Sequence, residues 1–388
     1  LLKNIHNYFL TLNIKKKKID ITNYLSLLSI IFINIFFYRI AEHGTDRSAQ
    51  ILVFLLIIEL LIFINLKQKN NNLNLLNLYL LAAIIVSLKA FYILYAIFFI
   101  PMFLLMRTRS QSYIKAFHLL IFNKFFILFL LLFLFVIFTN FINTGCIIYP
   151  VSSTCFDTIN WGISSEQTLK MNDHYELWSK GGYTPNSRVS NPSEYIQGFY
   201  WVENWIDIYF FNKVSDFILG LILLITIVSF FFREQFFKKK IKKNNNYIYL
   251  VYITLIILLI EWFLSHPALR YGGYCIIALL FFIPFCLRLE KSNMNYNKYS
   301  TSIIILIIIT ILVFNVRNFN RIIKEVNFYN YKPIEYTHYF IHESSFRIQK
   351  KMNNLILQYN NCKERKNNCN LEKQKIYKKY GKIIFKNR

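Results

Sequence analysis

The sequence predicts an all-α, polytopic membrane protein, and three observations support this fold class. Of the 388 residues, 55% are hydrophobic and 18% are aromatic. The apolar residues gather in long uncharged runs, each near the roughly 20 residues that a helix needs to cross a bilayer. The basic residues, which give a net charge of +25, cluster at the ends of these runs and in the tail. We therefore expect charges that fix topology in a lipid bilayer, and no nucleic-acid partner.

About nine crossings are expected. The third and fourth apolar runs form one stretch, 75–106, which is interrupted at Ser87-Leu88-Lys89. A single helix over this stretch would be about 48 Å long, which exceeds the hydrocarbon core, so we expect two short helices. The runs lie at about 22–40, 51–66, 75–88, 90–106, 119–141, 215–232, 248–264, 272–288 and 301–316.

Basic segments between the runs predict which loops share a side of the membrane. The segment REQFFKKKIKK at 233–243 is the strongest cytoplasmic marker, and RTRSQSYIK at 107–115 agrees with it. Nine alternating crossings then place the short loops AEHGTDRSAQ (41–50) and SHPALRYGGY (265–274) on the outer side.

The same alternation divides the chain into four parts. We expect N-terminal membrane helices, an outer segment, C-terminal membrane helices and a basic outer tail. The four parts are 1–141, 142–214, 215–316 and 317–388.

Because the first residue is Leu1 rather than Met, we also expect a fragment or an incomplete gene prediction.

Within the outer segment, residues 193–211 carry aromatic and aliphatic side chains at three-to-four spacing. Glu194, Glu203 and Asp207 interrupt the apolar pattern. We expect an amphipathic helix that lies in the membrane interface. The alternative is a segment that simply leads into the next crossing.

Four cysteines form two pairs that are close in sequence. Cys146 and Cys155 lie in the outer segment, and Cys362 and Cys369 lie in the tail. Outer segments permit disulfides, so we expect one bond within each pair. A zinc site is the alternative, although these spacings match no usual zinc pattern. The other two cysteines share one apolar run and are expected to be buried thiols.

The first outer loop is dense in titratable residues. Glu42, His43, Asp46 and Arg47 fall within ten positions. Acid, base and guanidinium groups so close together suit a phosphorylated or sugar-like substrate. Anchoring of the loop at the interface is the alternative explanation.

The loop 265–274 combines residues that suit phosphate recognition. Arg270 can make two hydrogen bonds to one phosphate, and His266 can transfer a proton or donate to a pyrophosphate. We group Tyr271 with them as a substrate-binding candidate. The alternative is an arginine that binds lipid headgroups at a helix end.

Two further pairs of residues have open alternatives. Asp173 and His174 suit a divalent cation or a general base, or else form a polar surface, and we assign no metal ligands. Glu59, inside an apolar run, can pair with Lys89 or act as a proton relay, and a relay would favour a transporter.

Four stretches carry a family resemblance: 41–50, the segment TGCIIYPVSSTCF at 144–156, HPALRYGGY at 266–274, and the cysteine-paired tail. They resemble a family of bacterial multi-pass inner-membrane proteins that is similar to GT-C type glycosyltransferases and O-antigen ligases or polymerases. The resemblance implies sugar transfer from a polyprenyl-phosphate donor at the outer face of the bacterial inner membrane. It also implies that an acid of the first outer loop, Asp46 or Glu42, serves as base or metal ligand.

The expected function is therefore glycosyl transfer or polymerisation in cell-surface polysaccharide synthesis. Arg270 is the expected ligand of the lipid pyrophosphate, and a divalent cation is an optional cofactor. A transporter or flippase of a polar or lipid-linked substrate is the alternative, as is a membrane protein without chemistry.

Overall fold

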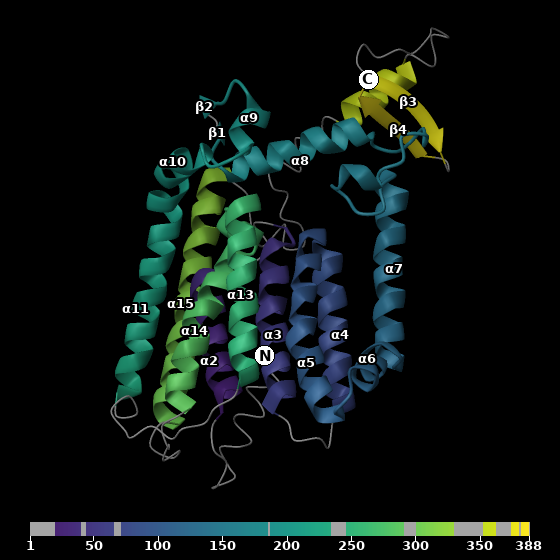
Figure 1. Ribbon diagram of the computed structural model, residues 1–388. Helices are drawn as coiled ribbons and strands as arrows, with labels where there is room; N and C mark the ends of the chain where they lie inside the picture. Colours follow the sequence, from purple (N-terminus) through teal and green to yellow (C-terminus); the bar gives the residue numbers. More distant parts are fainter. Residues whose placement is uncertain are drawn as a thin grey trace. The chain divides into compact units, whose positions relative to one another are not determined.

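The computed structural model describes residues 20–39, 44–65, 71–184, 187–233, 246–290, 300–329, 352–361, 374–379 and 382–387. Most of them are helical (Figure 1). The chain forms two compact units: residues 1–157 with 163–317, and residues 158–162 with 318–388.

The first unit holds the long apolar helices and the segments that connect them. Its helices are α2 (Ile21–Phe36), α3 (Asp46–Asn65), α4 (Asn71–Leu88), η1 (Ala90–Phe98), α5 (Phe99–Ser110), α6 (Tyr113–Ile121), α7 (Lys124–Thr144), η2 (Ser152–Thr154), α8 (Ser165–Ser179), α9 (Pro192–Ile196), α10 (Trp201–Trp205), η3 (Ile206–Val214), α11 (Ser215–Phe231), α13 (Asn246–Ser265), η4 (Leu269–Tyr271), α14 (Gly273–Glu290) and the start of α15 (Ser300–Tyr329). A small antiparallel hairpin pairs β1 (Tyr183–Thr184) with β2 (Ser187–Arg188).

The second unit contains the end of α15, a helical segment at 352–361 and an antiparallel hairpin. The hairpin joins β3 (Gln374–Lys379) to β4 (Lys382–Asn387), with Ile376 opposite Phe385. These two short hairpins are the strands of the described chain and qualify the expected all-α class only locally.

Seven helices of the described chain are long and apolar enough to cross a membrane by length and composition. The multi-pass, helical class of membrane protein is confirmed. Two of the nine expected runs form shorter apolar helices, Ile21–Phe36 and Asn74–Leu88, so length alone does not establish nine crossings. The seven long helices are Asp46–Asn65, Ala90–Ser110, Lys124–Thr144, Trp201–Phe231, Asn246–Ser265, Gly273–Glu290 and Ile303–Lys324.

The stretch 75–106 divides into two helices, as its length predicts. α4 ends at Leu88, Lys89 is extended, and η1 begins at Ala90. The Thr45 hydroxyl donates to the Leu88 carbonyl at 2.9 Å, so the start of α3 lies beside the end of α4. The bond satisfies one of the last carbonyls of α4, which have no intrahelical partner.

The opposite end of the unit is defined by other contacts. Arg109 Nη2 donates to the Phe63 carbonyl at 3.2 Å, and the Tyr247 hydroxyl donates to Thr108 Oγ1 at 2.7 Å. These contacts join the ends of α3 and α5 to the start of α13. The described ends of α3 and α5 and the start of α13 therefore lie at one common end of the unit, and the predicted cytoplasmic segment 107–115 begins there.

The run expected at 119–141 is divided between α6 and α7. Asn123 Oδ1 accepts from the backbone N–H groups of Phe125 and Phe126, at 3.0 and 2.9 Å. This side chain caps the start of α7, so the helix begins later than the hydrophobic pattern suggests.

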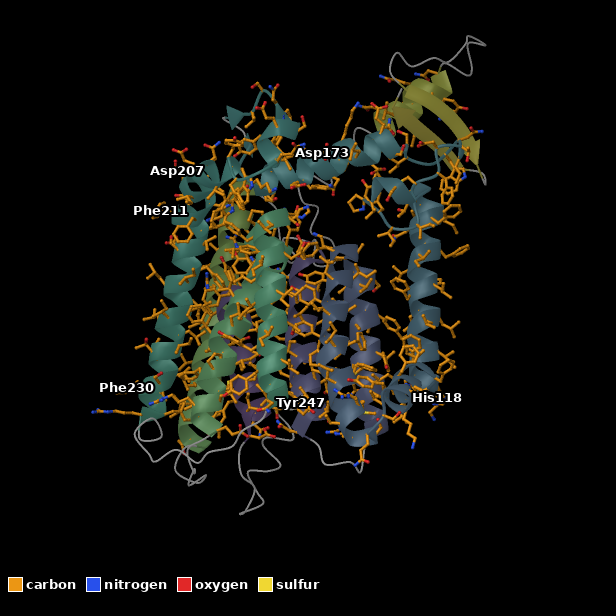
Figure 2. All side chains as sticks on the ribbon, in the orientation of Figure 1. His118, Asp173, Asp207, Phe211, Phe230 and Tyr247 are labelled. Atoms are coloured by element: carbon orange, nitrogen blue, oxygen red, sulfur yellow. A yellow bond between two sulfur atoms is a disulfide. The ribbon has the colours of Figure 1, made fainter. Side chains whose placement is uncertain are left out.

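The expected in-plane helix at 193–211 is wrong in its boundaries. α9 ends at Ile196, and α10, η3 and α11 then form one continuous apolar helix, Trp201–Phe231. Asp207, Phe211 and Phe230 mark the length of this helix in Figure 2. No proline interrupts residues 201–231, and η3 continues the helix in π geometry, since Ser215 N–H donates to Phe210 O. The alternative, a segment that leads into the next crossing, describes residues 201–214 better.

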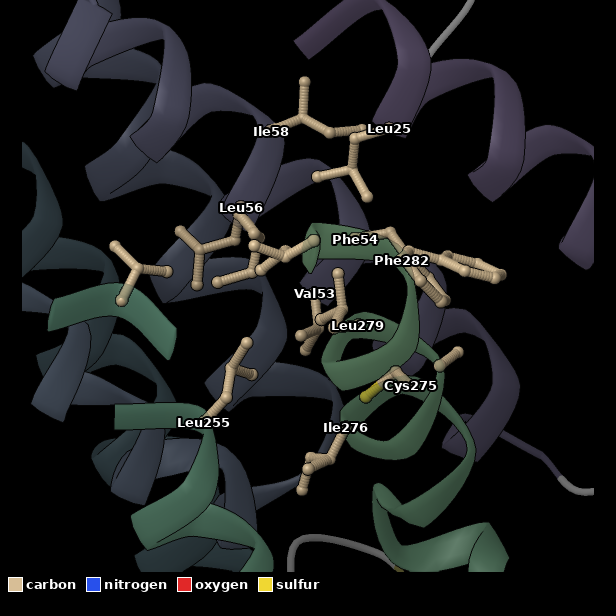
Figure 3. Close-up of a cluster of buried hydrophobic side chains, with 14 of the residues drawn as sticks. Leu25, Val53, Phe54, Leu56, Ile58, Leu255, Cys275, Ile276, Leu279 and Phe282 are labelled. Atoms are coloured by element: carbon tan, nitrogen blue, oxygen red, sulfur yellow. The ribbon is translucent and has the colours of Figure 1, made fainter. Parts of the chain in front are cut away.

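The core of the first unit packs α2 and α14 against α3. Phe54 and Phe282 are fully buried, and Leu25 and Leu279 lie in the same cluster (Figure 3). Cys275 faces this cluster, and it and Cys286 are buried free thiols, as expected for these two residues. The close packing fixes α14 on α3, and with it the loop that precedes α14.

The break at Lys89 predicts that the loop after α4 shares a side with the outer segment. We expect an impermeant thiol reagent to label Ser87→Cys and Tyr200→Cys from one side, and Lys115→Cys from the other, because all three positions are exposed. Labelling in intact cells and in inverted vesicles measures this, with Cys362 and Cys369 replaced by serine as the background. Labelling of Ser87→Cys and Lys115→Cys from the same side would contradict a change of chain direction at Lys89.

Candidate functional site

Asp46, at the start of α3, is the centre of a buried ion-pair cluster. Its side chain is only 2% exposed. Lys89 Nζ forms an ion pair with Asp46 Oδ1, and Arg270 Nε donates to Asp46 Oδ2 at 3.0 Å. We call Asp46, Lys89 and Arg270 the Asp46 cluster. It joins three segments that are far apart in the sequence.

Local backbone structure places each charge where it is favoured. Asp46 lies in the first turn of α3, where the helix dipole stabilises an anion. Lys89 follows the last turn of α4, where the dipole stabilises a cation. The antiparallel packing of these two helices brings both charges to the same end of the unit.

Gln50 anchors the loop 265–274 to α3, one turn after Asp46. Its Nε2 donates to the Arg270 carbonyl at 2.8 Å, and its Oε1 accepts from the Cys275 N–H at 3.2 Å. The Gln50 side chain is fully buried, the bond to Cys275 is buried and the bond to Arg270 is partly buried. The amide therefore fixes the backbone on each side of the two glycines.

Gly272 and Gly273 are required by close contacts. Gly272 has φ +98°, and a Cβ at this position would lie 2.9 Å from the Tyr95 hydroxyl. A Cβ at Gly273 would lie 2.6 Å from the Trp262 ring. Only glycine adopts this φ and this approach without strain. The glycine pair therefore lets the loop lie directly on η1 and α13.

Tryptophan side chains hold the other half of the loop. Trp205 Nε1 donates to the Pro267 carbonyl at 2.7 Å, and Trp262 Nε1 donates to the Ala268 carbonyl at 3.0 Å. Both bonds are buried, so these loop carbonyls are satisfied although they lie away from water. The loop is consequently fixed from α10, α13 and α3 at once.

Aromatic rings pack against the two cations of the Asp46 cluster. Lys89 Nζ lies 4.7 Å from the centroid of the Tyr271 ring. The Arg270 guanidinium lies 5.2 Å from the Tyr271 ring and 5.3 Å from the Trp178 ring of α8. Such cation–π contacts orient the cations without consuming their hydrogen-bond donors.

His266 is an uncharged base beside this cluster. Its ring packs on Phe91 and Tyr271, and its Nδ1 is buried without a hydrogen-bond partner among the described residues. Burial, together with the nearby charges of Lys180 and Lys89, lowers the pKa of His266 to about 4. Neutral imidazole is therefore the resting form, with one nitrogen able to accept or donate.

The charge balance of the Asp46 cluster favours an anion. Two cations face one carboxylate, and both carboxylate oxygens are already paired. The side chains of Arg270 and Lys89 are 36% and 28% exposed. Among the described residues, only Nε of the Arg270 guanidinium donates a protein hydrogen bond, which leaves its two terminal amino groups available as donors. A phosphate matches this pair of donors.

Two sequence expectations are replaced by other contacts. Lys89 pairs with Asp46 rather than with Glu59, because Lys89 lies at the end of α4 beside the start of α3. Arg47 does not join the cluster. Its guanidinium lies between the Phe37 and Tyr274 rings and donates to the Phe36 carbonyl at 3.1 Å, which ties α2 to α14.

The remaining candidates lie elsewhere. Glu42, His43, Cys362 and Cys369 are outside the described residues. Cys146 and Cys155 form a disulfide at the end of α7.

Asp173 and His174 lie in α8, where Figure 2 labels Asp173. The His174 ring packs on Tyr183 at 4.6 Å, and burial and Glu176 raise the pKa of Asp173. In the described part of the chain, no three His, Cys, Asp or Glu side chains gather as a metal site.

Sequence reasoning missed Gln50 and Trp178. Gln50 falls in a quoted motif, and its i+4 spacing from Asp46 puts both on one helix face. A polar side chain one turn below a buried acid was a usable signal. Trp178 carries no such signal, because its partner Arg270 is distant in the sequence.

The low pKa of His266 predicts a pH-dependent stability. The unfolded chain has the ordinary pKa of 6.5, so it takes up the proton first as pH falls. Burial of neutral His266 therefore leaves the free energy of unfolding unchanged above pH 6.5. The free energy of unfolding then falls between pH 6.5 and about 4, by up to about 3 kcal/mol. Thermal unfolding of the detergent-solubilised protein at pH 7.5 and 5 measures it. His266→Gln should flatten this slope relative to His174→Gln, and equal slopes would contradict the assignment.

Comparison with known proteins places the chain in a family. No curated protein and no solved structure matches the sequence. A family model described as a domain of unknown function, DUF8201, matches residues 2–277. The match covers more than half of the 388 residues and includes every member of the Asp46 cluster. The chain therefore belongs to the DUF8201 family.

Proposed function

We propose that the protein transfers or polymerises sugars from a polyprenyl-phosphate-linked donor in cell-surface polysaccharide synthesis. The observation that supports this proposal most is the Asp46 cluster, with its excess positive charge and the uncommitted donors of Arg270. The cluster lies at the end of a bundle of apolar helices. The phosphate of a lipid would lie at the same level of the membrane as this end of the bundle, because lipid headgroups border the hydrocarbon core.

The proposed arrangement gives each residue a distinct role. Arg270 donates its terminal N–H groups to the phosphate, and Lys89 adds a point charge. Asp46 holds both cations in place and leaves no oxygen free to act as a base. This differs from the catalytic role expected for Asp46, and it leaves Glu42 of the same outer loop as the candidate base.

The reaction is a substitution at the anomeric carbon of the donor sugar. An acceptor hydroxyl attacks this carbon while a carboxylate takes its proton, and the bond to the lipid phosphate breaks. The leaving group is the lipid phosphate with its bonding electron pair. Arg270 and Lys89 stabilise the negative charge that develops on this leaving group.

Nine crossings and an outer position of the site form part of the proposal. Two short apolar helices, α2 and Asn74–Leu88, would then cross the membrane along with the seven long ones. The Asp46 cluster and α8 then share the outer side, opposite the basic segment 233–243. The bacterial inner membrane is the proposed location.

The alternative of a transporter has less support from the geometry. Glu59 of α3 is half-buried, between the positions of Leu56 and Leu60 along the helix. Those two residues line a cavity whose other walls are apolar side chains and two tyrosines. A pathway for a polar solute would need polar groups in that position.

The proposal predicts that cluster variants lose surface glycan. Arg270→Ala and Asp46→Ala should each lower the amount of the dependent cell-surface polysaccharide at least about ten-fold, since losing a charged hydrogen bond costs more than about 1.4 kcal/mol. Gel analysis of the polysaccharide measures this at matched protein levels. Lys170→Ala, which removes a basic residue that is 72% exposed in α8, is the control. Full glycan in Arg270→Ala would sink the proposal.

A further inference from the structure

We propose that an apolar cavity beside α7 holds one aliphatic chain of the lipid whose phosphate the Asp46 cluster binds. We call it the α7 cavity. It has a volume of about 230 Å³ and lies between α3, α4, η1, α5 and α7. The inference rests on the proposed function only for the headgroup. Its walls include Leu56, Leu78, Ile85, Phe99, Met102 and Phe133.

The chemistry of the walls excludes polar ligands. All lining residues are apolar except Tyr92 and Tyr95. Apolar cavities of roughly 150 Å³ in proteins stay dry and bind small hydrocarbons. The α7 cavity is larger and equally apolar, so a hydrocarbon chain is a better occupant than water.

The mouth of the α7 cavity opens on the membrane-facing surface of the bundle. Three of its lining residues reach the surface: Ile93 of η1 and Leu130 of α7 are 37% and 40% exposed, and Ala96 of η1 is also exposed. None of the 18-residue apolar window of α7 is buried within the protein. Lipid chains surround such a helix in a bilayer, so a chain enters sideways without leaving the apolar phase.

η1 connects the α7 cavity to the Asp46 cluster. Lys89 immediately precedes η1, and Tyr92, three residues later, lines the cavity. The Tyr92 hydroxyl lies within 3.7 Å of a Cβ built on Gly272, in the same loop as Arg270. Tyr92 and Tyr95 of η1 therefore line the cavity while their hydroxyls lie against the loop that carries Arg270.

The Tyr92 hydroxyl is a second observation that points to a ligand. Tyr92 is 1% exposed, and its hydroxyl has no hydrogen-bond partner among the described residues. An unpaired buried hydroxyl is costly, and an oxygen of a bound lipid headgroup would satisfy it. The cations of the Asp46 cluster, the unpaired Tyr92 hydroxyl and the apolar cavity thus follow one another along η1. This order matches a lipid with a phosphate headgroup and an aliphatic chain.

The test is photo-crosslinking of the full chain in phosphatidylcholine vesicles. The probe is a long-chain alkyl monophosphate with a diazirine midway along the chain. We expect adducts at Ile93, Ala96 and Leu130, mapped by mass spectrometry. Ala96→Phe, at the exposed mouth, should lower their yield about ten-fold, which corresponds to about 1.4 kcal/mol of lost affinity.

Two further variants guard against an effect on folding. Ala82→Phe fills the α7 cavity from α4 and should have the same effect as Ala96→Phe. Leu131→Phe adds a ring on the face of α7 that is 59% exposed and should leave the yield unchanged. Equal labelling in all variants, spread over the exposed face of α7, would overturn the inference.

The headgroup is tested separately with Arg270→Gln and with an uncharged diazirine alcohol of the same chain. If Arg270→Gln lowers the adduct yield and Ala96→Phe does not, the cavity inference fails and the phosphate site stands. If Ala96→Phe lowers the yield for both probes and Arg270→Gln changes neither, the chain site stands and the proposed phosphate site fails.

Discussion

One buried carboxylate organises the end of the bundle that we assign to function. Asp46 is almost inaccessible, so its charge is tolerable only while Lys89 and Arg270 stay in place. Those cations come from the break between α4 and η1 and from the loop before α14. The Asp46 cluster therefore holds together the start of α3, the break after α4 and the loop before α14. Gln50, one turn later in α3, also holds the loop before α14 in place, through neutral hydrogen bonds to the backbone of Arg270 and Cys275.

The same constraint explains why the cluster suits an anion. Because a different cation pairs with each carboxylate oxygen of Asp46, the cluster keeps one positive charge in excess. The rings of Tyr271 and Trp178 orient Lys89 and Arg270 and leave hydrogen-bond donors free. The site is preorganised before any ligand arrives, and the cost of holding the cations in position is met on folding.

Sequence reasoning predicted the features that depend on local pattern. Hydrophobic run length predicted the helices, the interruption at Ser87–Lys89 predicted the reversal, and the outer loops predicted that Asp46 and Arg270 lie on one side. It failed where partners are distant or periodicity is ambiguous. Glu59 was a plausible partner of Lys89 by charge alone, but the packing of α4 against α3 places Lys89 beside Asp46, with which it forms an ion pair. At 201–214, three-to-four spacing does not separate an in-plane helix from one that continues into a crossing.

The most direct test of this account is a double-mutant cycle on Asp46 and Arg270. Thermal unfolding in detergent would be measured for Asp46→Asn, Arg270→Gln and the double variant. A buried ion pair predicts that each single change destabilises the protein and that the double variant is little worse than either, with a coupling free energy of at least about 1 kcal/mol. Additive effects of the two substitutions would show that the carboxylate and the guanidinium act independently, and would contradict the account.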